Sequence, residues 1–189
     1  MSEDVPGAIG RYRQKPSRPL LAREAPGLPW PLRPGSARGD LPDINVWLAL
    51  ALKEHVHHEA ALRYWAEVQA SDAAAPGHEP ALWFCRATML GLVRLMCQPK
   101  VVGAGAMALH DAFALYRSYL ALPGVGLLPE PPTSDVELEA LVAARAIPPR
   151  MWSDAWLASQ ARASGLRLVT FDKDFLRFNL ERCIVLPVQ

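Results

Sequence analysis

Cysteine is scarce in this sequence: among 189 residues only Cys85, Cys97 and Cys183 occur, and no two of them form a CxxC pair. This scarcity argues against a disulfide framework and against a cysteine-based zinc knuckle. Each of the three lies within an apolar run, which is typical of buried, reduced thiols in intracellular proteins.

Long apolar runs and an excess of one charge are also missing. No stretch of about 18 apolar residues occurs, and the first residues contain no apolar signal core, so we expect a cytoplasmic protein with no membrane partner. The chain has 20 Lys and Arg against 19 Asp and Glu, for a formal net charge of +1. This balance neither indicates nor excludes a nucleic-acid partner, because such binding depends on local patches of charge.

The first 39 residues differ in composition from the rest of the chain. They contain seven of the 18 prolines and seven of the 20 Lys and Arg, and their apolar residues show no lasting periodicity. Such a segment cannot bury enough apolar surface to fold by itself. We expect residues 1–39 to be a disordered tail, or the result of a start codon set too far upstream, and residues 40–189 to form one domain.

From Leu41 onward, short apolar runs alternate with segments of helical period. Strands are predicted at the start of LPDINVWLAL and over residues 80–85, 124–130, 167–171 and 183–188. Helices are predicted over the rest of that first segment and over residues 57–70, 86–98, 107–122, 134–147 and 151–165. This alternation indicates an α/β fold, a three-layer α/β/α sandwich with a central, mostly parallel sheet.

Four aspartates stand where the predicted strands end or a helix begins. Asp43 lies in the first strand-to-helix transition, Asp154 in the first turn of the last predicted helix, and Asp172 and Asp174 follow the strand before them. Each alone has a structural interpretation, as a helix cap, a turn cap or a partner of the helix dipole. Ligands of parallel sheets bind beyond the carboxyl ends of the strands, so these acids are also placed to meet in one pocket.

Converging carboxylates repel one another unless a cation compensates their charge. Hard divalent ions such as Mg²⁺ and Mn²⁺ prefer oxygen ligands, and they can activate a water molecule and stabilise charge on a phosphodiester. The four acids therefore make a metal-dependent hydrolase of phosphodiesters the first hypothesis.

Three segments resemble blocks of a PIN domain, and more narrowly the VapC-type toxins of bacterial toxin–antitoxin modules: DINVWLALALKEHVHHEAALRYW, FCRATMLGLVRLMCQPKVVG and SDAWLASQARASGLRLVTFDKDF. The resemblance runs from about Leu41 to the C-terminus and is weakest between Ala104 and Ile147. It implies a cytoplasmic, metal-dependent endoribonuclease that cleaves RNA, forms a homodimer and is held inactive by a cognate antitoxin.

Carried over residue by residue, the resemblance implies that Asp43, Asp154 and Asp172 are catalytic ligands of Mg²⁺ or Mn²⁺. Asp174 is implied as an accessory ligand. Asn45 would support the turn after the first strand, and the hydroxyl group of Thr170 would orient the acids.

The resemblance also implies where an antitoxin would bind. We expect it to cover an apolar groove between the early helices, predicted over residues 57–70 and 86–98. An arginine of the antitoxin would then enter the acidic pocket.

One position departs from the family pattern. Such toxins commonly carry a glutamate three residues before an arginine on the helix after the second strand, and counting back from Arg94 this position is Gly91. A three-acid site should bind its ion more weakly, so the alternative is a PIN scaffold that binds RNA or antitoxin without cutting. A phosphatase-like hydrolase with Asp43 as nucleophile is disfavoured, because Asn45 replaces the second acid of the usual DxD motif.

Three arginines are candidate RNA contacts, Arg86, Arg94 and Arg150, because guanidinium groups bind phosphate in bidentate fashion; surface ion pairs are the other interpretation. Trp152 is assigned to core packing in preference to stacking on a base. His57 and His58 face about 100° apart on a helix, so we assign them to a solvated helix start and not to a metal site.

Overall fold

The computed structural model describes residues 39–72, 80–144 and 146–187, so the tail expected over residues 1–39 lies outside this part of the chain except for Gly39. The strands are β1 Asp40–Pro42, β2 Leu82–Phe84, β3 Val125–Leu127, β4 Arg167–Thr170 and β5 Cys183–Val185. The helices are α3 Ile44–Ala51, α4 His58–Asp72, α5 Arg86–Met96, α6 Pro99–Val102, α7 Leu109–Leu120, α8 Ser134–Ala144 and α9 Trp152–Ser164. Short 3-10 turns are η1 Gly103–Gly105, η2 Pro149–Met151 and η3 Lys173–Phe178.

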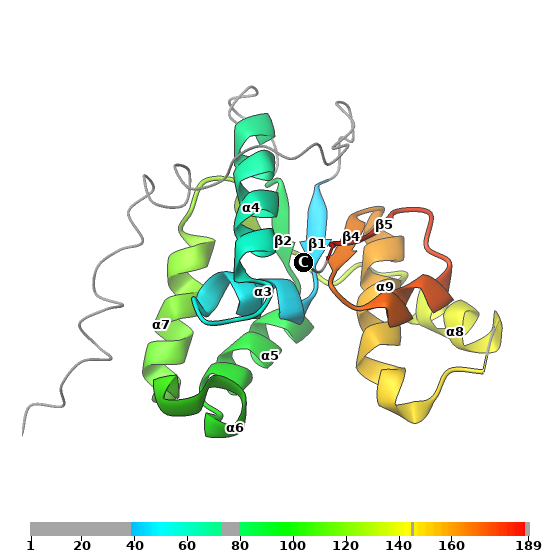
Figure 1. Ribbon diagram of the computed structural model, residues 1–189. Helices are drawn as coiled ribbons and strands as arrows, with labels where there is room; N and C mark the ends of the chain where they lie inside the picture. Colours follow the sequence, from blue (N-terminus) through cyan, green and yellow to red (C-terminus); the bar gives the residue numbers. More distant parts are fainter. Residues whose placement is uncertain (1–38, 73–79, 145, 188–189) are drawn as a thin grey trace, which may run out of the picture.

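The five strands form one sheet in the order β3-β2-β1-β4-β5, and every neighbouring pair is parallel. The predicted parallel sheet is therefore confirmed. β1 lies in the middle, next to β4, which follows it in the chain by more than 120 residues. Because parallel strands all end at the same edge, the segments that follow β1, β2 and β4 meet there (Figure 1).

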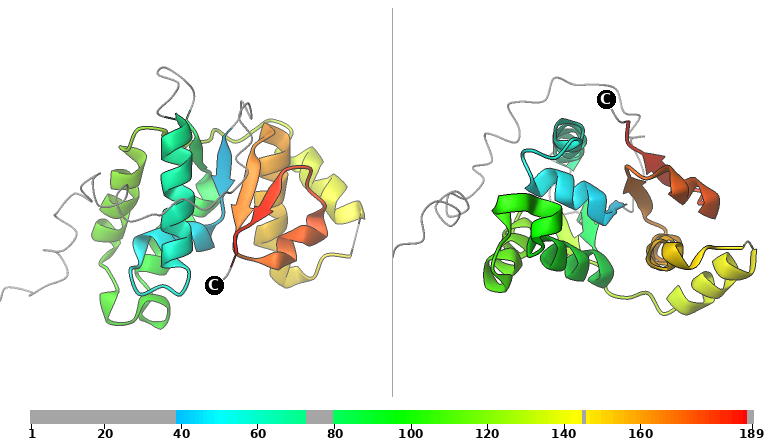
Figure 2. Two further views of the ribbon diagram at one scale, coloured as in Figure 1. Left: turned by 45° about the horizontal axis from the view of Figure 1, so that its top comes forward. Right: turned by 60° about the horizontal axis from the view of Figure 1, so that its bottom comes forward.

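Helices cover both faces of the sheet, which confirms the three-layer sandwich. In Figure 2, left, α4 lies in front of β2 while α9 lies behind β4. Two apolar clusters correspond to the two faces: one joins α3, α4, α5 and α7 to the sheet, and the other joins α8, α9 and η3 to it. Adjacent residues of β4 alternate between them, since Leu168 belongs to the second cluster and Val169 to the first.

Aromatic residues form the centre of the first cluster. The ring of Trp47 on α3 stacks on Phe84 of β2, with ring centroids 3.7 Å apart. Trp65 and Tyr119 pack against Trp47 edge-on, at 6.4 and 5.6 Å. These rings hold α3 tightly on the sheet, so the residues at the start of α3 are positioned by a rigid element.

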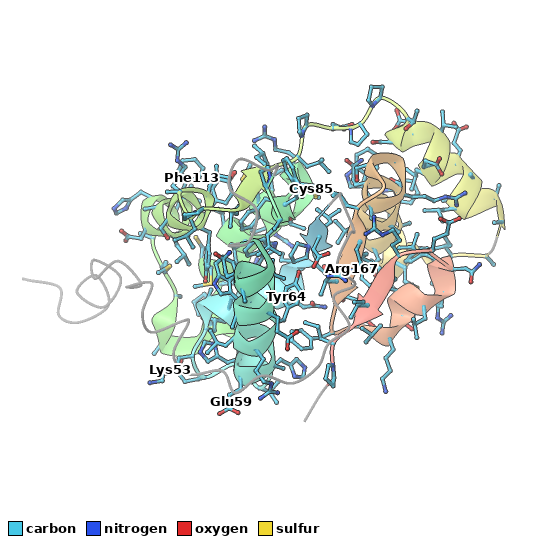
Figure 3. All side chains as sticks on the ribbon, turned by 90° about the horizontal axis from the view of Figure 1, so that it is seen from above. Lys53, Glu59, Tyr64, Cys85, Phe113 and Arg167 are labelled. Carbon is cyan, nitrogen blue, oxygen red and sulfur yellow. The ribbon has the colours of Figure 1, made fainter. Side chains whose placement is uncertain are left out.

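A buried ion pair joins the beginnings of β1 and β4. Asp40 and Arg167 stand opposite each other in the register, and two hydrogen bonds of 2.7 Å run from the guanidinium group to the carboxylate. The hydroxyl group of Tyr64 on α4 donates to the same carboxylate at 2.7 Å, and all three residues are buried. Figure 3 labels Tyr64 on α4 and Arg167 on β4. Burial and the Asp40 carboxylate raise the pKa of Tyr64, so its hydroxyl group stays protonated and donates.

The end of α5 differs in detail from the sequence prediction. Pro99 was expected to end the helix over residues 86–98, but α5 ends at Met96 and Pro99 begins the short helix α6. Proline suits this first helical position because its missing N–H group would have no partner there. α9 ends as expected at Gly165, which has the left-handed conformation with φ 66°.

Within the described ranges, no helix has the length and apolar character needed to span a bilayer.

Replacing Arg167 with Met tests the buried ion pair. The variant leaves the Asp40 carboxylate buried without a cation, so we expect the free energy of unfolding to fall by about 3–5 kcal/mol. The matched control is Arg162→Met, which removes a half-exposed ion pair with Glu137 at 2.9 Å and should cost at most about 1 kcal/mol. Urea unfolding measures both, and equal losses would contradict a special role for the buried pair.

Candidate metal-dependent active site

The structure brings the predicted acids to the carboxyl edge of the sheet. Asp43 follows β1 directly, and Asp172 comes two residues after the end of β4, the neighbouring strand. Asp154 lies in the first turn of α9. Asp43 and Asp154 each feel the negative charge of Asp172, and Asp43 also feels that of Asp154, so the three carboxylates share one electrostatic environment.

Asp43 is held firmly by its neighbours. Its Oδ1 atom accepts a hydrogen bond of 2.6 Å from the Ile44 N–H group at the start of α3, and its Oδ2 atom accepts one of 2.8 Å from the hydroxyl group of Thr170. Asp43 is thus the N-cap of α3 as well as a candidate ligand, so the structural interpretation holds beside the functional one.

Burial raises the pKa of Asp43 from 3.8 to about 6. The hydrogen bonds from Thr170 and Ile44 act in the opposite direction, while the carboxylates of Asp154 and Asp172 raise the pKa further. Burial also raises the pKa of Asp154, followed by the charges of Asp172 and Asp174. Negative charge gathers here without sufficient compensation from the protein.

Thr170 and Asn45 link the two strand ends that carry the acids. The Thr170 hydroxyl oxygen accepts from the side-chain amide of Asn45 and from the N–H group of Asp172, both at 3.0 Å, while it donates to Asp43. The amide oxygen of Asn45 accepts from the Phe171 N–H group at 3.2 Å. These contacts are the kind expected of orienting residues, and the functional roles of Asn45 and Thr170 stay predictions.

Asp174 lies at the rim of the site and is engaged by two arginines. It accepts from Arg150 at 3.3 Å and from Arg177 at 3.2 Å, and all three side chains reach solvent. Sequence reasoning missed Arg177, although its spacing of three residues from Asp174 on a helical turn was a usable signal. Asp172 in turn accepts from the N–H group of Asp174 at 2.8 Å and caps η3.

The structure separates the other two candidate arginines. Arg86 is the exposed first residue of α5, which follows β2 at the edge where the acids lie. Arg94 stands eight residues later, roughly 12 Å further along the helix at 1.5 Å per residue. Of Arg86 and Arg94, only Arg86 is therefore at the same edge as the acids.

The position expected for a fourth acid, Gly91, lies against the end of the Ile44 side chain. A Cβ atom at Gly91 would overlap the Cδ1 atom of Ile44, the residue next to Asp43. Any side chain there requires Ile44 to move, because α5 packs against α3 at this point. The acidic group therefore consists of Asp43, Asp154 and Asp172, with Asp174 at its rim.

The acids have the chemistry of a site for a hydrated hard cation. Across the described residues, no group of three or more His, Cys, Asp or Glu side chains is arranged to hold a metal ion. Mg²⁺ usually keeps several waters and is held by one or two carboxylates together with substrate phosphates, so it does not need an enclosing cage. Oxygen-only donors and uncompensated negative charge on Asp43 and Asp154 fit Mg²⁺ or Mn²⁺.

His57 and His58 were predicted to form a solvated helix start, and this prediction was wrong. His55, His57 and His58 are half-buried, and each has a partner. The ring of His57 stacks on Phe171 with centroids 4.5 Å apart, His58 Nδ1 lies 2.7 Å from the Ala49 carbonyl oxygen, and His55 Nδ1 accepts from the His57 N–H group. These contacts pack the loop before α4 against the sheet edge.

The assignment of Trp152 to the core was also wrong. Its side chain is 58% exposed, because the buried face of α9 begins only at Ala155. Leu176 on η3 is similarly exposed, at 59%. The place of Trp152 in the first turn of α9 was a signal of this exposure, since that turn projects beyond the sheet.

The expected groove between the early helices is filled. α3 lies between α4 and α5 (Figure 1), and the apolar faces of both helices belong to the first core cluster. Among the large exposed apolar side chains, Leu90 lies on α5, Val101 on α6, and Leu109 and Phe113 on α7.

Comparison with known proteins adds three findings. Residues 41–180 match the family model of the PIN domain. Ribonuclease VapC41 of Mycobacterium tuberculosis (strain CDC 1551 / Oshkosh) is 37% identical over 140 residues, which cover 72% of this chain and 90% of the relative. Ribonuclease VapC38 of M. tuberculosis (strain ATCC 25618 / H37Rv) is 34% identical over 134 residues, which cover 69% and 82%.

Among solved structures, the chain is similar to one in the 2.2 Å structure of VapBC-1 from nontypeable Haemophilus influenzae, with a TM-score of 0.48 and 15% identity. The similarity covers 77% of this chain and 96% of that one.

The raised pKa of Asp43 predicts how stability depends on pH without metal. Its folded pKa of about 6 exceeds the ordinary 3.8, so the wild type loses stability as pH rises through this range. Relative to Asp43→Asn, which cannot ionise, the wild type should lose up to about 3 kcal/mol between pH 4 and pH 7. Urea unfolding of both proteins in chelator measures the difference. Added Mn²⁺ should reduce it at pH 7, and a difference that does not change with pH would contradict the assignment.

Proposed function

The chain belongs to the PIN-domain family and is of the VapC type, and from this premise we propose that it is an endoribonuclease that cleaves RNA phosphodiester bonds with the help of Mg²⁺ or Mn²⁺. Support comes above all from one observation: Asp43, Asp154 and Asp172, from three separate elements, converge at the carboxyl edge of a parallel sheet. The names of its relatives VapC41 and VapC38 describe them as ribonucleases, which agrees with this proposal.

Asp43, Asp154 and Asp172 would hold the ion, with Asp174 as an accessory. Mg²⁺ or Mn²⁺, when bound, supplies a Lewis acid that activates water and stabilises charge on the phosphate group. The Ile44 N–H group and the Thr170 hydroxyl group keep the Asp43 carboxylate in one orientation. Through its bond to the Asp172 N–H group, Thr170 positions the second strand end as well.

The contact residues follow from the same geometry. Arg86 and Arg150 lie near the acids and would bind RNA phosphates, as exposed guanidinium groups do. Arg94, further along α5, would reach only a longer RNA.

Protein partners are part of the proposal. A cognate antitoxin would neutralise the enzyme in the cytoplasm, and the active form would be a homodimer. The exposed apolar residues on α5, α6 and α7 are candidates for these interfaces, because such side chains are usually covered by a partner when they cluster.

Expression of the chain in bacteria tests the toxin role. We expect growth to stop, and we expect Asp43→Asn or a co-expressed antitoxin to relieve this arrest.

The second candidate is a PIN scaffold that binds RNA or antitoxin without cutting. It is favoured by one observation, the packing of Ile44 where a fourth acid would otherwise enter from Gly91. Retention of Asp154 and Asp172 at one edge favours the nuclease, since a scaffold has no need of both.

Cleavage of total bacterial RNA in Mg²⁺, in Mn²⁺ and in chelator tests the enzyme. We expect discrete, metal-dependent fragments, and a loss of rate of about 100-fold or more in Asp43→Asn, a cost common when a group that stabilises transition-state charge is removed. The control variant is Asp135→Asn, an exposed aspartate on α8, which should cut like the wild type.

Fragment ends from this experiment would identify the target RNA. If neither the wild type nor Asp135→Asn cuts in any metal while RNA binding persists, the scaffold function replaces the nuclease. Equal cleavage by wild type and Asp43→Asn would instead place the active site elsewhere.

A further inference from the structure

Trp152 is an exposed tryptophan in the first turn of α9, the turn that also carries Asp154. In the part of the chain that the structure describes, Trp47 and Trp65 are buried, Trp83 and Trp156 are half-buried, and Trp152 alone is exposed. An indole ring is among the most favourable groups to bury, so its place in solvent gives no benefit to folding. The packing of this domain therefore does not account for the residue.

The position of Trp152 relates it to the acids. It is the first residue of α9 and precedes Asp154 by two residues, a Cα separation of about 5 Å in a helix. Residues two apart on a helix project from nearly opposite sides of it, so the indole ring does not point into the acidic group and leaves the same helix turn on another side.

The charges around Trp152 suit RNA. Arg150 stands two residues before it and reaches Asp174, which Arg177 also contacts. Exposed ion pairs of this kind are weak, so the guanidinium group of Arg150 can exchange Asp174 for a phosphate group at little cost. An aromatic ring beside arginines is the combination by which proteins bind single-stranded nucleic acid.

We propose that Trp152 is a positioning residue on which an unpaired base next to the scissile phosphate stacks, while Arg150 binds a phosphate group of the same strand. This assignment rests on the proposed ribonuclease function and narrows it to RNA whose bases are unpaired at the cut. A base in a duplex has both faces covered by its neighbours and cannot stack on the ring, so loops and single strands are selected.

RNA binding in chelator tests the assignment without cleavage. The probes are a single-stranded oligoribonucleotide of mixed sequence and the same sequence as a duplex, with the full-length chain in each case. Trp152→Ala should weaken binding of the single strand about tenfold or more, while Trp152→Phe keeps most of it and duplex binding changes little. Leu176→Ala is the matched control, because it removes an equally exposed apolar side chain without a ring for stacking. Thermal unfolding should be unchanged in all three variants, since both side chains are exposed.

A second measurement connects the residue to the reaction. On an RNA cut by the wild type, Trp152→Ala should raise KM much more than it lowers kcat, and an abasic nucleotide beside the cut should impair the wild type but add no further loss to Trp152→Ala. The proposal is overturned if Trp152→Ala binds single strands like the wild type, if single strand and duplex weaken equally, or if Phe fails to restore binding. Loss of antitoxin binding or dimer formation with RNA binding intact would also overturn it, in favour of a protein interface.

The two proposals fail in different ways. A wild type that cuts RNA with unchanged activity in Trp152→Ala retains the nuclease and removes the stacking role. A wild type that binds single-stranded RNA through Trp152 but never cuts it retains stacking and removes the nuclease, and a wild type without RNA binding overturns both.

Discussion

The pairing of β1 with β4 is the constraint on which the rest of the structure depends. These strands lie side by side although 127 residues separate their partners, and a side-chain contact holds each end: Asp40 with Arg167 where the strands begin, and Asp43 with Thr170 where they end. A slip of register would break both contacts and turn each strand's buried residues to the wrong face. Correct register is therefore what brings Asp43 and Asp172 to the same edge.

The two ends treat buried charge in opposite ways. Asp40 has a full counterion in Arg167 and a second partner in Tyr64, so its charge is compensated within the protein. Asp43 is also buried, but its partners are a hydroxyl group and a backbone N–H group, and the neighbouring charges are negative. The strand is thus stabilised at one end and left with uncompensated charge at the other. That imbalance is what a site requires if its counterion is to come from solution.

The second face of the sheet determines how the site is entered. α9 packs against β1 and β4 through residues from Ala155 onward, and its first turn projects past the sheet edge. Asp154 and Trp152 both belong to that turn, one beside the other acids and one in solvent. On the first face, the side chain of Ile44 packs against Gly91 of α5. Access to the acids is therefore bordered by the start of α9 and by η3.

Local patterns in the sequence determined the elements and the places of the acids within them. Apolar runs and helical periods depend on residues close in the chain, so the strand and helix order was predictable, as was the position of Asp43, Asp154 and Asp172 at element ends. Only the tertiary structure decided what surrounds each side chain. The pairing of Asp40 with Arg167, the contact of Ile44 with Gly91, the stacking of His57 on Phe171 and the exposure of Trp152 depend on how distant segments pack. Local periodicity carries no record of those neighbours, because they are brought together by the sheet and not by the chain.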